Sequence, residues 1–181
     1  PYGTAQDAVG KDFPEKGQNY NLEVDNPLVL PSGQKVRFLV TSADVIHSFW
    51  VPQLGGKNDV VPNHINHLWL EPNMTGTYVG QCAEYCGTQH ANMLITVVVH
   101  EEADWNAWVS NQQNDSIANA SAAAGHELFL RTACINCHRV RGTPANGDFA
   151  PDLTHLMSRA TIGSGVVANT RENLLAWVND P

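Results

Sequence analysis

Residues 82–93 read CAEYCGTQHANM and bring four possible metal ligands into one short loop. The ligand groups are two thiols, an imidazole and a thioether, from Cys82, Cys86, His90 and Met93. These are soft to borderline ligands, so the set favours copper over calcium or magnesium. His47, in the upstream segment DVIHSFW (44–50), is the candidate for a second imidazole. Two thiols at this spacing could bridge two metals, but the spacing alone also permits a disulfide or a zinc site.

Short apolar runs on both sides of this loop predict β-strands. They cover residues 36–41, 67–71, 77–81 and 94–100, and each is bounded by Pro, Gly or Asn. Several short strands at this spacing favour a sandwich or Greek-key barrel over alternating βαβ units. A histidine supplied from a strand end to a downstream Cys–His–Met loop is the layout of a copper site in a cupredoxin barrel. We therefore expect an all-β Greek-key cupredoxin barrel over residues 1–109.

A second cysteine pair, Cys134 and Cys137, is followed directly by His138. This is the C-x-x-C-H signature of c-type haem attachment. Two thiols at this spacing can add to the two vinyl groups of haem, and the adjacent imidazole can then reach the iron. A C-x-x-C alone could be a redox dithiol or half a zinc site. The following histidine and the absence of a thioredoxin-like βαβ pattern favour haem.

The periodicity becomes helical after His100. Acidic residues fill a first helical turn at 101–104, where the helix dipole favours them. A further helix is expected over 125–133, and another near Thr170, where Asn169 and Glu172 fit a capping arrangement.

The stretch SNQQNDSIANASAAA, residues 110–124, is small and polar. Such a composition has little to bury and predicts a linker. The expected organisation is thus the β domain over 1–109, the linker over 110–124 and an all-α domain over 125–181.

The charge balance limits the partners of the chain. There are 10 Lys and Arg against 18 Asp and Glu, a net charge of −8, and most of this excess lies in residues 1–110. An acidic surface repels phosphate backbones, so nucleic acid is excluded as a partner and basic proteins are favoured. No apolar run reaches the roughly 18 residues that a membrane span requires, so membrane attachment is not visible in this sequence.

Residues 41–99 closely resemble subunit II of haem-copper cytochrome oxidases, which holds a dinuclear copper centre (CuA) in a cupredoxin domain. The matching motifs are DVIHSFWVP (44–52) and GQCAEYCG (80–87), followed by His90 and Met93. The resemblance implies that Glu84 binds copper through its main-chain carbonyl and that its carboxylate reaches a magnesium ion shared with subunit I. The side-chain copper ligands that it implies are His47, Cys82, Cys86, His90 and Met93.

Residues 125–129 and 150–156, on either side of the second motif, resemble class I cytochromes c. The resemblance implies that the Pro151 carbonyl orients the proximal imidazole of His138. It also places the sixth haem ligand in a methionine loop after the helix at 169–181, so the cytochrome c domain is expected to be truncated. Within the chain, the alternative sixth ligand is Met157, with His155 and His126 as lesser candidates.

Together the two resemblances imply the soluble part of subunit II in a cytochrome-c-fused (caa3-type) terminal oxidase. The implied function is electron transfer from a donor, such as a cytochrome c or a quinol-oxidising complex, through haem c to CuA and on to subunit I. Subunit I and other membrane-bound subunits are the implied partners, on the periplasmic or outer face of the cytoplasmic membrane. Two alternatives remain open: a CuA protein of the nitrous oxide reductase type and a copper-delivery module.

Overall fold

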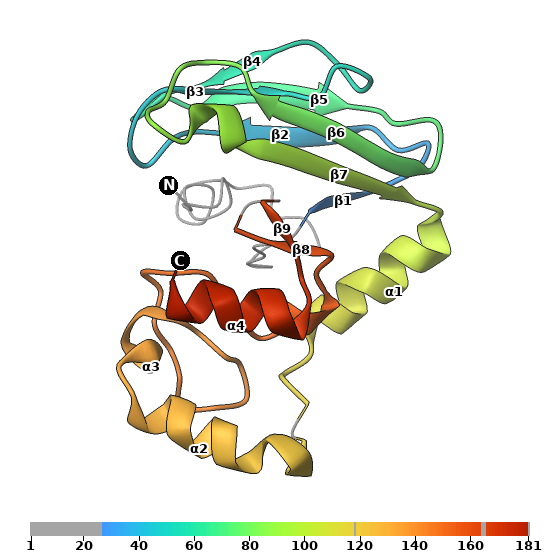
Figure 1. Cartoon of the computed structure of the whole chain (residues 1–181). Coiled ribbons are helices and arrows are strands. Elements are labelled where there is room, and N and C mark those ends of the chain that lie inside the picture. Colours follow the sequence, from blue (N-terminus) through green and yellow to red (C-terminus); the bar gives the residue numbers. More distant parts are fainter. Residues whose placement is uncertain (1–26, 118, 164–165, 181) are drawn as a thin grey trace.

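The computed structural model describes residues 27–117, 119–163 and 166–180. Strands occupy the first part of the described chain, up to His100, and helices dominate the part that follows (Figure 1). Helix α1, Glu102–Gln113, begins just after the last long strand, which ends at His100, and runs toward the helical part (Figure 1).

The first part contains two sheets. The larger sheet has the strand order β1–β7–β6–β3–β4, and β2 and β5 form a separate antiparallel pair. Within the larger sheet β1 runs parallel to β7, and the other pairs are antiparallel. The bounds are β1 Leu28–Pro31, β2 Val36–Val40, β3 His47–Trp50, β4 Asn58–Val60, β5 Asn66–Leu70, β6 Gly76–Cys82 and β7 Leu94–His100.

Strands β2, β5, β6 and β7 confirm the four runs expected from the sequence. Strands β1, β3 and β4 were not predicted, because they span only three or four residues and show no sustained alternation. The cupredoxin-like sheet architecture is thus present, whereas the Greek-key connection stays a prediction.

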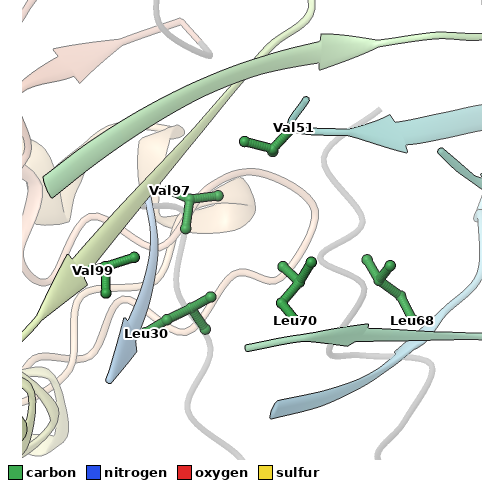
Figure 2. Close-up of a cluster of buried hydrophobic side chains, with 6 residues drawn as sticks. All are labelled: Leu30, Val51, Leu68, Leu70, Val97 and Val99. Carbon is green, nitrogen blue, oxygen red and sulfur yellow. The ribbon is translucent and has the colours of Figure 1, made fainter. Parts of the chain in front are cut away.

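The two sheets share one core of aliphatic side chains that point toward one another (Figure 2). In β7 the side chains alternate, so that Val97 and Val99 are buried and Val98 is only half-buried. Burying an aliphatic side chain of this size contributes roughly 1.5–3 kcal/mol. The cluster therefore supports the strands that carry His47 and Cys82; its members are Leu30, Val51, Leu68, Leu70, Val97 and Val99.

The second part is mainly helical, as expected, with one small β pair. Its helices are α1 Glu102–Gln113, α2 Ala123–Arg131, α3 Cys134–Cys137 and α4 Arg171–Asn179. Short 3-10 turns are η1 His90–Asn92, which lies between β6 and β7, η2 Ala120–Ala122 and η3 Leu156–Ser158. The pair β8 Thr161–Ile162 and β9 Val167–Ala168 departs from an all-α domain. Among the described residues, no helix has the length and hydropathy that crossing a membrane requires.

The cap of α4 differs from the predicted one. Thr170 is the N-cap, and its hydroxyl accepts a hydrogen bond from the Asn173 amide at 3.1 Å. The Asn169 side chain instead donates to the carbonyl oxygens of Leu156 and Arg159. Asn169 and Thr170 are both residue types that can cap a helix. Because the Asn169 side chain makes long-range hydrogen bonds instead, Thr170 caps α4.

The stretch predicted as a linker, residues 110–124, contains regular structure. Helix α1 continues through Gln113, and α2 begins at Ala123. Gln112 is only 2% exposed, although its neighbours in sequence are polar. Composition predicted a flexible linker here because hydropathy does not reveal a segment that polar contacts hold in place. The domain boundaries themselves stay predictions.

Candidate functional site

Strands β3 and β6 bring the first imidazole to the first thiol. His47 begins β3 and Cys82 ends β6, and the antiparallel register pairs Cys82 with Phe49. The strands approach closely at Gly80, where an added Cβ would lie 2.2 Å from the Trp50 carbonyl oxygen. Glycine is therefore required at this position, and its close approach lets the strand ends converge on the site.

The loop that follows Cys82 is closed on itself by backbone hydrogen bonds. The Cys82 amide donates to the Met93 carbonyl oxygen at 2.9 Å, which joins the two ends of the loop. Within the loop, the His90 amide donates to the Gly87 carbonyl oxygen at 3.0 Å. Gly87 has a φ of +126°, in the region that favours glycine. The loop is thus folded by its own backbone and returns its later side chains toward Cys82.

Cys82 faces one nitrogen and one oxygen donor. Its Sγ lies 3.8 Å from His47 Nδ1 and 3.1 Å from the main-chain oxygen of Glu84. Cys82 is buried, whereas the side chain of Glu84 is exposed. The carbonyl of Glu84 therefore points into the site while its carboxylate stays available on the surface.

Cys86 faces the other imidazole and the thioether. Its Sγ lies 3.6 Å from His90 Nδ1 and 3.8 Å from Met93 Sδ. The sulfurs of Cys86 and Cys82 are 3.8 Å apart, well beyond the roughly 2.05 Å of a disulfide. Each thiol thus has its own imidazole and its own weaker donor, and the two thiols are close enough to share two metals.

This donor set fits a copper pair better than one zinc ion. The donor atoms of His47, Cys82 and Cys86 all lie within 4.8 Å of one another, and within the described chain His90 falls outside this group. A tetrahedral Cys₂His₂ zinc site would need both imidazoles in a single group. Two thiolates with a thioether nearby also suit copper, which accepts soft sulfur ligands.

Asp44 holds His47 from the side away from the thiols. Its Oδ1 lies 2.9 Å from His47 Nε2 and accepts a hydrogen bond from the Ser42 hydroxyl at 2.9 Å. Although burial opposes ionisation, these hydrogen bonds and one from the Val45 amide lower the pKa of Asp44 to about 2. Burial likewise works against a charged His47, but Asp44 and Cys82 raise its pKa. The contact occupies Nε2 and leaves Nδ1 to face Cys82.

The two thiols have different acidities. Burial raises the pKa of Cys82, but backbone hydrogen bonds at Ser48 and Glu84 and the two imidazoles outweigh it and lower the value to about 7. Burial and the neighbouring Cys82 raise the pKa of Cys86. Because a metal binds the thiolate form, loading the pair releases protons, and Cys82 is the easier thiol to ionise.

The second motif lies at the end of the helical turn α3. Cys134 and Cys137 begin and end this turn, and His138 follows with its Nδ1 2.8 Å from the Pro151 carbonyl oxygen. The expected contact of Pro151 with His138 is present, and Nε2 is the ring nitrogen that this contact does not use. Gly147 packs on the backbone of the motif, where an added Cβ would lie 2.4 Å from the Cys137 carbonyl carbon. Sequence reasoning missed this close approach.

The helical part exposes large apolar side chains, which fits a region that covers a large apolar cofactor. Beyond Gln113, Ala145 and Ile162 are the only hydrophobic residues buried among those described. Several large apolar side chains are 62–87% exposed instead: Leu128, Phe149, Met157, Leu175 and Val178. A haem linked to α3 would supply the apolar surface that this part of the chain does not bury by itself.

The alternative sixth ligands have different surroundings. Met157 lies in η3 and is 65% exposed. His155 Nε2 lies 3.0 Å from the Asn114 carbonyl oxygen, and His126 is exposed on α2. Met157 stays a prediction as the sixth ligand.

A β domain with paired thiols, followed by a C-x-x-C-H turn, defines a CuA-type copper protein joined to a c-type cytochrome. Comparison with family models agrees. The model described as "Cytochrome C oxidase subunit II, periplasmic domain" matches residues 7–100, and the model described as "Cytochrome c" matches residues 122–177. The chain belongs to the cytochrome c oxidase subunit II family and carries a cytochrome c domain.

Individual relatives give the same family. Cytochrome c oxidase subunit 2 of Alkalihalophilus pseudofirmus is 38% identical over 166 residues, covering 91% of this chain and 48% of the relative. The corresponding protein of Bacillus sp. (strain PS3) is 34% identical, covering 90% and 49%. The solved periplasmic domain of subunit II (CoxB) of Bradyrhizobium japonicum is 40% identical over 49% of this chain and 64% of its own, with a TM-score of 0.48. The chain thus spans about half the length of the curated relatives it matches.

Proposed function

We propose that this chain is the electron-entry part of a respiratory terminal oxidase. It takes up electrons at the Cys134–His138 motif, passes them to the Cys82–Cys86 site and delivers them to subunit I, where oxygen is reduced. When bound, haem c and the copper pair supply the one-electron redox chemistry. The chain itself supplies the ligands and holds them in position.

The observation that carries the proposal is the division of donors between the two thiols. Cys82 has His47 and the Glu84 carbonyl, and Cys86 has His90 and Met93. A protein that only delivers single copper ions has no need for two adjacent sets of donors. A pair of metals held by shared thiolates can instead spread one electron over both ions, which favours rapid transfer.

The residues around the site keep its geometry nearly constant while charge changes. Asp44 fixes the ring of His47, and the hydrogen bond between Cys82 and Met93 fixes the loop ends. Rigid ligands lower the reorganisation that accompanies each electron transfer. In the helical part, Pro151 fixes His138 in the same way.

The partner and the location follow from the family. We place the chain on the periplasmic or outer face of the membrane, attached to a membrane-bound complex by a further segment. The exposed Glu84 carboxylate is the candidate contact to subunit I, through a shared magnesium ion. Its main-chain oxygen, 3.1 Å from Cys82 Sγ, would be the copper ligand, so Glu84→Ala should keep the copper and weaken only the magnesium site.

Metal analysis of the loaded chain tests the proposal. We expect two copper ions per chain and an electron paramagnetic resonance spectrum with an electron shared between both. Cys86→Ser should abolish that spectrum, because one of the two bridges is lost. Cys134→Ser is the matched control, since it removes a thiol outside the site and should leave both copper ions. One copper or one zinc ion per wild-type chain would contradict the assignment.

A further inference from the structure

Helix α1 is fastened to the copper-bearing sheet by its first half. Trp105 donates from Nε1 to the Val29 carbonyl oxygen on β1 at 3.4 Å. One turn later Val109 is 8% exposed. The helix packs against both β1 and β7, the edge of the five-stranded sheet. These contacts fix the direction in which α1 leaves the sheet (Figure 1).

The end of α1 is fastened to the haem-binding part. Arg141 donates from Nη2 to the carbonyl oxygen of Gln112, and Gln112 is 2% exposed. In return, the Arg141 carbonyl oxygen accepts hydrogen bonds from the Ser116 amide at 3.1 Å and the Ser116 hydroxyl at 2.8 Å. Arg141 stands three residues after the haem-binding His138. We call Gln112–Ser116 together with Arg141 the latch.

Further contacts surround the latch. His155 Nε2 lies 3.0 Å from the Asn114 carbonyl oxygen and 3.1 Å from Arg141 Nη2. Asp115 lies against Gly142, where an added Cβ would be 2.9 Å from the Asp115 Cβ. The backbone of the latch is therefore held on several sides by residues that follow the C-x-x-C-H motif.

The contacts to the sheet and the Gln112 contact of the latch lie on one continuous helix, and the other latch contacts follow directly after it. Trp105 and Gln112 are both within α1, separated by about two turns or roughly 10 Å of helix. A helix of this length bends little, so the copper-bearing sheet and the haem-binding part are held at a fixed orientation. The 15-residue polar stretch that composition assigned to a flexible linker contributes its first residues to this rigid connection.

We propose that the latch is a positioning device that fixes the haem-binding part relative to the copper site. The inference rests on the proposed function, since a fixed separation matters only if electrons pass between the two sites. Arg141 is its central positioning residue, because its side chain binds the last turn of α1 and its carbonyl binds Ser116 just beyond the helix. The spacing between the sites is then set by the fold rather than by diffusion on a tether.

Backbone ¹⁵N relaxation tests the latch without measuring electron transfer. The sample is the fully reduced, copper-loaded, carbon monoxide-bound chain with its haem, which is diamagnetic. We compare the amides of β6 and β7, in the copper-bearing part, with the amides of α2 and α4, in the haem-binding part. We expect both groups to have the same rotational correlation time. Arg141→Ala should cause loss of this common value, with the helical part tumbling faster. Arg131→Ala is the control, because Arg131 is exposed and pairs only locally with Glu127.

A second variant covers the case in which Arg141→Ala does not fold. Ser110 and Asn111 are exposed on α1 between its two attachments. The double change Ser110→Gly, Asn111→Gly leaves every latch contact in place and loosens the helix between them. We expect the common correlation time to be lost here too. Separate tumbling in the wild type, or common tumbling in every variant that folds, overturns the latch whatever the metal count shows.

Discussion

The copper-bearing and haem-binding parts of the chain are built on different principles. In the first, six aliphatic side chains form a closed core between two sheets. In the second, Ala145 and Ile162 are the hydrophobic residues buried among those described beyond Gln113. The first part brings its metal ligands together through strand register and loop hydrogen bonds. The second presents a short motif and a large amount of exposed apolar surface.

The difference indicates two ways in which a cofactor can relate to a hydrophobic core. It can bind beside a core that the protein has already formed, or it can supply most of the apolar surface that the protein buries. Copper is small, and the protein can assemble its ligands around an existing sheet. Haem is large and apolar, and a short helical region gains most of its buried surface by covering it. We therefore expect the two parts to respond very differently to loss of their cofactors.

Removing the haem attachment should have the largest effect. In a Cys134→Ala, Cys137→Ala variant, haem is no longer covalently held, so we expect the cooperative unfolding transition of the helical part to disappear. The transition of the copper-bearing part should persist at nearly the same temperature. Differential scanning calorimetry of the haem-free chain measures both. A retained second transition would show that the helical part has a sufficient core of its own.

A core truncation should act on the copper-bearing part alone. Leu70 is 2% exposed, so Leu70→Ala should lower the free energy of unfolding of that part by about 2–5 kcal/mol. Leu94→Ala is the control in the same part, because Leu94 is 42% exposed and should cost less than about 1 kcal/mol. Urea unfolding followed by tryptophan fluorescence measures the difference. Equal costs for the two leucines would contradict the core described here.

The smallest expected effect concerns the pair Asp44 and His47 in the metal-free chain. The pKa of Asp44 falls from 3.8 to about 2 on folding, so its contribution is present above pH 3.8 and is lost as the pH falls toward 2. The pKa of His47 is raised from 6.5, so its contribution is present below pH 6.5 and is lost as the pH rises through the folded value.

The pair should therefore stabilise the metal-free chain between about pH 4 and pH 6.5. Asp44→Asn should remove this contribution, which we expect to be below about 1 kcal/mol because Asp44 is 43% exposed. Urea unfolding at pH 5.5 and pH 9 compares the variant with Asp59→Asn, which makes the same charge change on β4. A difference that is larger at pH 9 than at pH 5.5 would contradict the assigned pairing.

The sequence was most informative where chemistry and spacing coincide. The two thiols, the His90 imidazole and the Met93 thioether lie together because the loop of residues 82–93 is short and its ends join strands. The contact of Pro151 with His138 was expected only from the resemblance to class I cytochromes c, because a separation of 13 residues does not by itself require it.

Contacts between polar groups were the part that sequence could not supply. Asp44 precedes His47 by three residues outside any helix, and nothing in that spacing requires their hydrogen bond. Gln112 is buried, and its carbonyl oxygen accepts a hydrogen bond from Arg141, which is 29 residues away. Such contacts leave no hydropathy signal, so a segment of small polar residues was interpreted as a tether.

Internal electron transfer is the most direct test of the central claim that one chain joins two redox sites. The measurement is rapid photochemical reduction of the haem in the copper-loaded chain, followed by absorbance of both sites at several chain concentrations. We predict that the haem is reoxidised as the copper pair is reduced, at a rate that does not change with chain concentration. A rate that rises in proportion to chain concentration, or haem reoxidation without copper reduction, would contradict it.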